Sequence, residues 1–124
     1  MGKLLIFSDH GLLTIKAEGN ISVLQIQELL ISKYEEWIGI SSLWDFSEAN
    51  IVDASFESIH EFSKKIRTML EQIGRVKVPL YSNNMNSFPY VRMFESIFDD
   101  EEIGMQFHSF KDQNEAKEWL QRVN

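Results

Sequence analysis

The chain has 124 residues, no cysteine, a net charge of −7, 44% hydrophobic residues and 25% charged residues. This size and balance fit one ordinary globular domain and argue against a disordered chain. The absence of cysteine excludes disulfides and thiolate chemistry, and the negative charge argues against nucleic-acid binding and against attraction to anionic membranes.

The amino-terminal segment has only a four-residue apolar run before Ser8. That run is too short for the core of a signal peptide, and no apolar run approaches the length of a membrane span. We therefore expect a cytoplasmic protein with no membrane insertion.

The chain begins with a predicted hairpin, in which strands from Leu4 to Phe7 and from Leu12 to Ala17 flank a turn. Glu18-Gly19-Asn20 is expected to end the second strand. A helix from about Val23 to Trp37 follows, because Ser22 and Gln25 fit a capping box and apolar residues recur at three- and four-residue steps, with Ile38 on the same side.

The next strand is predicted from Leu43 to Phe46, and its continuous apolar character suggests a parallel strand covered on both faces. Asp45 interrupts it, so this carboxylate must reach water or a hydrogen-bond donor. A loop is expected over residues 47–50. Ser55 then caps a long helix that ends at Gly74, and its apolar stripe comprises Phe56, Ile59, Phe62, Ile66, Met69, Leu70 and Ile73.

The second half continues the alternation of strands and helices. Val76, Val78 and Leu80 alternate with Arg75 and Lys77, which predicts a strand with one wet side or a wet start. Pro79 predicts an unpaired edge or an irregular ladder. A polar loop leads to a helix from Ser87 to Phe98, followed by a last strand from Met105 to Phe110. Asp112 and Glu115 predict a capping box for a final helix, whose core residues are Ala116, Trp119, Leu120 and Val123.

The three histidines, His10, His60 and His108, lie on separate elements and have no metal-site spacing, so we expect surface positions and no metal or other cofactor. The predicted order β-β-α-β-α-β-α-β-α indicates one α/β domain over residues 1–124. It has a mostly parallel mixed sheet of about five strands, an amino-terminal hairpin and about four helices.

This order of elements resembles the SpoIIAA-like branch of the STAS (sulfate transporter and anti-sigma-factor antagonist) fold. The resemblance includes Gly19-Asn20-Ile21-Ser22 before the first helix, the strand that bears Asp45, and the ending from Phe110 to Leu120. It implies a STAS/SpoIIAA-like fold and a non-enzymatic role in regulation through contact with another protein.

In anti-sigma-factor antagonists, the helix after this strand opens with Asp-Ser-Ser-Gly-Leu-Gly, and a partner kinase phosphorylates the second serine. Asp53-Ala54-Ser55 matches the first three positions, whereas Phe56 and Glu57 replace the glycine and leucine. A bulky ring and a negative charge beside Ser55 would hinder the approach of a kinase. Ser55, with Asp53, is thus a candidate regulatory site, and a plain helix cap is the other interpretation.

The sequence contains two further candidate sites. In open α/β sheets, ligands favour the crevice beyond the carboxyl ends of strands. That crevice would gather polar and aromatic side chains suited to a small polar or lipid-like ligand, and SpoIIAA-like sequences also resemble CRAL-TRIO lipid binders. Its candidate residues are Asp45, Ser47, Asn50, Ser55, Tyr81, Ser82 and Asn83. Asp45 and Asp53 could form an acid/base pair, but no matching nucleophile or set of oxyanion donors accompanies them.

The sequence therefore predicts a non-enzymatic interaction domain that uses the face around Ser55. The resemblance alone suggests a regulatory kinase or a sigma-factor system as the partner, and a homodimer is the other expected assembly. A ligand-binding domain that uses the strand-end crevice is the alternative function.

Overall fold

The computed structural model describes residues 2–9, 12–99 and 103–122. Its sheet has five strands in the order β1-β2-β3-β4-β5, in which β1 and β2 are antiparallel and the later neighbours are parallel. The elements in chain order are β1 (Lys3–Asp9), β2 (Leu12–Ile21), α1 (Val23–Lys33), the 3₁₀ turn η1 (Tyr34–Trp37), β3 (Ser42–Ile51), α2 (Phe56–Ile73), β4 (Lys77–Tyr81), α3 (Phe88–Phe98), β5 (Gln106–Phe110) and α4 (Gln113–Gln121). The predicted mixed sheet with an amino-terminal hairpin is confirmed.

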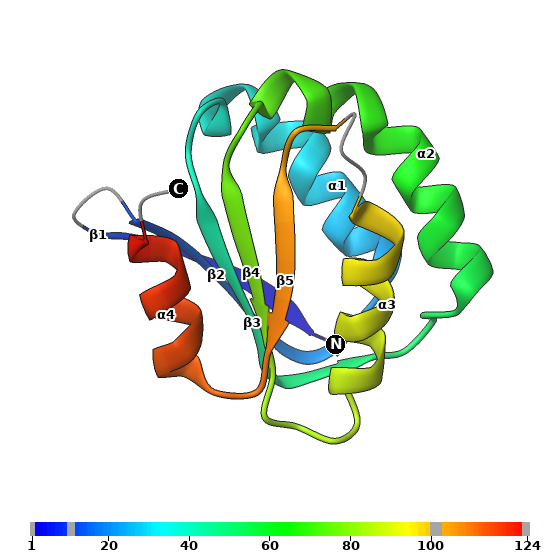
Figure 1. The fold of residues 1–124 in the computed structure, drawn as a ribbon. Coiled ribbons are helices and arrows are strands. Elements are labelled where there is room, and N and C mark those ends of the chain that lie inside the picture. The colour runs from blue at the N-terminus through cyan, green and yellow to red at the C-terminus, as the bar shows by residue number, and fades with distance from the viewer. Residues whose placement is uncertain (1, 10–11, 100–102, 123–124) are drawn as a thin grey trace.

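The helices form two layers around this sheet (Figure 1). Helices α1, α2 and α3 cover one face, and α4 lies alone on the other. The main core lies beneath the three helices, where apolar side chains of the strands meet their buried stripes. A smaller cluster of Leu43, Tyr81 and Ala116 anchors α4 to the opposite face. The sheet is therefore covered on both faces only where α4 lies, near β4 and β5.

Strands β2 and β3 extend further than the sequence predicts. The expected break at residues 18–20 and the expected loop at residues 47–50 are both wrong, because these segments pair with each other as parallel strands, from Glu18 with Glu48 to Ile21 with Ile51. The pairing of β2 with β3 shifts its register between Lys16 and Glu18, as it does at a β-bulge. Each segment supplies the other's backbone hydrogen bonds, and this pairing outweighs the local preference of glycine and asparagine for turns.

Pro79 lies inside the sheet and not at its edge. It belongs to β4, which lies between β3 and β5, and it is opposite His108 in the β5 register. Pairing of β4 with β3 is confined to Trp44 with Leu80 and Asp45 with Tyr81, after the proline. Of the two predicted explanations, the irregular ladder is therefore the one observed. Because β3 does not pair with β4 at Pro79, the ladder on that side needs no amide hydrogen from the proline.

The helix caps largely follow the sequence. Ser22 Oγ accepts a hydrogen bond from the Gln25 amide at 3.0 Å, and Gln25 Oε1 accepts one from the Ser22 amide at 2.9 Å, as a capping box requires. The predicted capping box at α4 is only half formed. The Asp112 side chain accepts a hydrogen bond from the Asn114 amide at 2.8 Å, but the Glu115 side chain does not accept one from the Asp112 amide. Ile38, expected in the core, is 51% exposed because the chain leaves the helical path at η1.

Two histidine predictions can be compared with the structure. His60 is exposed on α2, as expected, and His108 is exposed on β5 with its Nδ1 at 3.3 Å from Glu95 Oε2. His10 and Val123 lie outside the described residues. Within the described part of the chain, no helix is both long and apolar enough to cross a bilayer.

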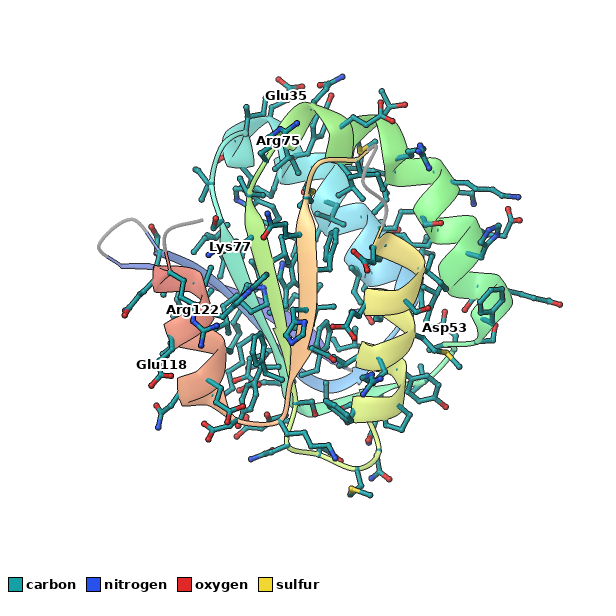
Figure 2. All side chains as sticks on the ribbon, in the orientation of Figure 1. Glu35, Asp53, Arg75, Lys77, Glu118 and Arg122 are labelled. Carbon is teal, nitrogen blue, oxygen red and sulfur yellow. The ribbon has the colours of Figure 1, made fainter. Side chains whose placement is uncertain are left out.

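Lys77 is the largest departure from the predicted side-chain pattern. The sequence places it on a wet side of its strand, but the side chain is buried between β4 and α4 (Figure 2). Its Nζ donates hydrogen bonds to the Trp119 and Arg122 carbonyl oxygens at the end of α4. It also lies 5.4 Å from the centroid of the Trp119 ring. The ammonium therefore gives the Arg122 carbonyl oxygen a donor beyond the helix, and it adds a second donor to the Trp119 carbonyl oxygen, which also accepts from the Arg122 amide.

Candidate functional site

Ser55 begins α2 and is exposed. Its Oγ accepts a hydrogen bond from the Ser58 amide at 3.0 Å, and Ser58 Oγ accepts one from the Ser55 amide at 2.9 Å. The two hydroxyl oxygens are 3.2 Å apart. Ser55 is thus the predicted N-cap, in a reciprocal capping box that the sequence does not reveal, because Ser58 stands where the usual pattern has Glu or Gln.

Replacing Ser55 with alanine is expected to lower the free energy of unfolding by about 1 kcal/mol, because the Ser58 amide loses its acceptor. Urea denaturation measures this directly. Ser63→Ala is the matched control, since Ser63 lies within the same helix and its hydroxyl donates to the His60 carbonyl oxygen. Equal losses for the two variants would show that the cap contributes nothing.

Asp53 joins the loop before α2 to the start of α1 (Figure 2). Its Oδ1 accepts a hydrogen bond from the Val23 amide at 2.8 Å, and the Val52 amide donates to the Ile21 carbonyl oxygen at 3.0 Å. The carboxylate lies at the positive end of the α1 dipole. The starts of α1 and α2 are thereby fixed side by side beyond the ends of β2 and β3.

Large apolar side chains are exposed at this junction. Phe56, predicted to join the buried stripe of α2, is 61% exposed, and Val52 and Leu24 are also exposed. Phe56 is exposed because it is the first helical residue, and the side of α2 that faces the sheet begins at Ile59. The Phe56 ring stacks on His60 with 5.9 Å between ring centroids. We call Leu24, Val52, Asp53, Ser55, Phe56 and Glu57 the Ser55 surface.

The predicted strand-end crevice is occupied by contacts among its own residues. Asp45 Oδ1 accepts from the Ser47 amide at 2.9 Å, and Ser47 Oγ accepts from the Asn83 amide at 3.3 Å. These bonds bring Asp45, Ser47 and Asn83 together, whereas Asn50 is exposed further along β3, opposite Asn20. Ligand binding by these groups stays a prediction.

Tyr81 and Ser82 lie apart from that exposed group. Tyr81 is buried against Leu43 and Ala116, beneath α4. Ser82 is fully buried, and its Oγ is 2.5 Å from Ser87 Oγ, which in turn donates to the Phe46 carbonyl oxygen at 2.9 Å. Ser82 and Ser87 therefore hold the β4–α3 loop against β3, whereas the Tyr81 ring packs beneath α4.

Asp45 and Asp53 have separate backbone partners and belong to different surroundings. Across the strands, Asp45 is opposite Lys16, whose Nζ lies 3.1 Å from Glu48 Oε2. The hydrogen bond to Glu48 raises the pKa of Lys16, and the same bond lowers the pKa of Glu48. Asp45 thus belongs to a hydrated, charged strip of the sheet, while Asp53 serves the helix starts. In the part of the chain that the structure describes, no group of three or more His, Asp or Glu side chains could hold a metal ion.

Comparison with known proteins identifies the fold. No family model matches the sequence, and no curated protein matches it. Among solved structures, the chain is similar to an uncharacterized protein of the DUF3478 family, with a SpoIIAA-like fold, from Shewanella loihica PV-4. The two share 16% sequence identity and a TM-score of 0.59, over 96% of this chain and 93% of that chain. The chain therefore has a SpoIIAA-like fold, which confirms the predicted resemblance at the level of the fold.

Proposed function

We propose that this protein is a non-enzymatic interaction domain that binds a partner protein through the Ser55 surface. The observation that carries the proposal is the joint exposure of Leu24, Val52 and Phe56 at the adjoining starts of α1 and α2. Apolar side chains gathered on a surface commonly mark a site of protein contact. An aromatic ring at the centre of such a site is the usual anchor of binding energy.

The charges around these side chains indicate the kind of partner. Asp53 and Glu57 are exposed beside Phe56, and Glu28 is exposed on α1 one turn beyond Leu24. The chain as a whole carries a net charge of −7. A partner with an apolar contact patch and a basic rim complements this arrangement.

Ser55 lies within this surface, so phosphorylation there would change the charge of the contact. A phosphate at the start of α2 gains about 0.3–1 kcal/mol from the helix dipole, while Asp53 and Glu57 repel it. The Ser55→Glu variant is therefore expected to alter partner binding. If that variant and wild type bind the same partner equally well, Ser55 is a cap and not a switch.

Site-specific photocrosslinking tests the interaction. A benzophenone side chain replaces Phe56 in the full chain, the protein is irradiated in its own cells, and adducts are identified by mass spectrometry. Phe7 is the matched control position, because it is also an exposed phenylalanine, at 52%, but lies on the edge strand β1. We expect a discrete adduct with a basic protein from position 56 and none of that mass from position 7.

The Glu57→Lys variant keeps the crosslinker and reverses one charge of the surface. This charge reversal should lower the yield of the adduct from position 56 if the partner carries a basic rim. Three outcomes would overturn the proposal: the absence of an adduct at position 56, identical adducts from both positions, and an adduct of twice the mass of this chain. The last would show that the surface pairs two copies of the protein.

A further inference from the structure

The two edge strands of the sheet, β5 and β1, differ in how their outer backbone groups are covered (Figure 1). On the outer edge of β5, Glu95 of α3 accepts hydrogen bonds from the Ser109 amide at 2.7 Å and from Ser109 Oγ at 3.0 Å. A charged side chain placed in this way occupies an edge amide and keeps another strand from pairing there. Among the described residues, no comparable acceptor lies along the outer edge of β1, which pairs only with β2.

The sequence of β1 leaves its outer edge open to another strand. The strand is seven residues long, and its centre is the apolar run from Leu4 to Phe7. Ile6 is 41% exposed and Phe7 is 52% exposed, and as neighbours in a strand they point to opposite faces of the sheet. Proline and central charges, which commonly protect an edge strand, are absent from this run. The edge of β1 is therefore a template for strand addition.

Two copies of β1 are complementary to each other. An antiparallel pair centred on Ile6 places Ile6 opposite itself and Leu5 opposite Phe7 of the second copy, on shared faces of the sheet. The same register places Lys3 opposite position 9, where the sequence has an aspartate. Apolar residues thus meet apolar residues at the centre, and opposite charges meet at both ends. A register centred on Leu5 would instead place Lys3 opposite Phe7.

Charges around β1 do not oppose the approach of a second copy. Each chain has a net charge of −7, but Lys3 and Lys16 lie 3.8 Å and 3.7 Å from the Glu18 carboxylate beside this edge. Lys16 also pairs with Glu48 at 3.1 Å. Two lysines and two glutamates therefore balance each other here, so the excess negative charge of the chain lies elsewhere.

We infer that β1 is a self-association strand, which pairs with β1 of a second copy in the antiparallel register centred on Ile6. The pairing joins two sheets into one continuous sheet about a two-fold axis. That axis runs perpendicular to the sheet, so α1, α2 and α3 of both copies lie on one face and both α4 helices on the other. The inference is independent of the proposed function, because it uses none of the residues of the Ser55 surface.

Disulfide trapping tests the register, because the chain has no cysteine of its own. In the dimer, the two Ile6 Cα atoms lie directly opposite, about 4.5–5.5 Å apart, which a disulfide can span. The two Phe7 Cα atoms are diagonal neighbours about 7–8 Å apart, beyond the usual span. Mild oxidation should therefore link Ile6→Cys into a covalent dimer at least about tenfold faster than Phe7→Cys.

Ile31→Cys gives the rate of random collisions, because Ile31 is a 45% exposed residue of α1. It should react at least about tenfold more slowly than Ile6→Cys. Equal rates for the three variants would overturn the inference, as would faster linkage of Phe7→Cys than of Ile6→Cys.

Sedimentation equilibrium of the full chain measures the association without a crosslink. Wild type should approach twice the chain mass of 14.5 kDa as concentration rises. Ile6→Lys places a charge at the centre of the pairing and should weaken association by at least about 30-fold. Ile31→Lys makes the same change at a similarly exposed residue and should stay within about twofold of wild type.

Thermal unfolding confirms that both lysine variants are folded. A wild-type chain that remains monomeric at every concentration would overturn the inference. Equal weakening by Ile6→Lys and Ile31→Lys would also overturn it, because the association would then not depend on β1.

Discussion

Alanine in place of Phe94 is expected to lower the free energy of unfolding by about 3–5 kcal/mol. Phe94 is buried at the centre of the main core, where its ring stacks on Phe46 at 6.2 Å and on Phe98 at 5.9 Å. It also meets Phe62 edge to face, with 6.2 Å between centroids. Because Phe94 borders a cavity of about 50 Å³ between the sheet and the three helices, its truncation enlarges an existing void. Urea denaturation with a constant slope measures the loss.

Phe56→Ala is the matched control for this substitution. It removes the same side chain from an exposed position, where changes usually stay within about 0.5 kcal/mol. A loss below about 1 kcal/mol for Phe94→Ala would contradict the described core. The pair also establishes that Phe56 can be altered for binding experiments without unfolding the protein.

The Lys77→Met variant is expected to lose about 2–3 kcal/mol of stability. Methionine keeps most of the packing of the lysine stem, but the Trp119 and Arg122 carbonyl oxygens lose a charged donor that lies 3.0 Å from the first of them. Hydrogen bonds to charged groups contribute about 1.5–3 kcal/mol. Because the lost contacts fix the end of α4, hydrogen exchange of the α4 amides should accelerate more than that of α2.

Lys64→Met is the control, since Lys64 is an exposed lysine of α2 that pairs with Glu61 at 3.6 Å. Such surface pairs contribute little, so this variant should remain within about 0.5 kcal/mol of wild type. Unchanged exchange in the α4 amides of Lys77→Met would show that the buried ammonium does not hold that helix.

The helices could be predicted because their signals are local. Ser22 and Ser55 mark helix starts, and the apolar residues that follow repeat at the helical period. The parallel extension of β2 and β3 could not be predicted in the same way. Gly19 and Asn50 favour turns in isolation, and only the neighbouring strand, about thirty residues away, supplies the partner that makes them extended.

In the candidate site too, the features with local signals could be predicted and those that depend on distant residues could not. The position of Ser55 at the start of α2 followed from its capping side chain and from the helical stripe after it, which are adjacent in sequence. The exposure of Leu24 and Val52 beside it did not, because it depends on the bond from the Val23 amide to Asp53. The burial of Lys77 could not be predicted from the sequence either, because its hydrogen-bond partners are carbonyl groups at the end of α4, more than forty residues later.

The interior cavity had no signal in the sequence. Its aromatic residues fit the apolar stripes of well-packed helices and strands, and those stripes specify which sides meet but not how completely they fill the space between them. The strand-end crevice was predicted from topology instead. In the structure, loop hydrogen bonds and α4 occupy much of that edge.

The affinity of the partner captured through position 56 tests the central claim most directly. Isothermal titration compares wild type with Phe56→Ala and with Phe7→Ala, two exposed phenylalanines on different parts of the chain. If the Ser55 surface is the contact, Phe56→Ala weakens binding by at least about 30-fold, as expected for an anchor worth about 2 kcal/mol, and Phe7→Ala stays within about twofold. An affinity of Phe56→Ala equal to that of wild type would contradict the claim.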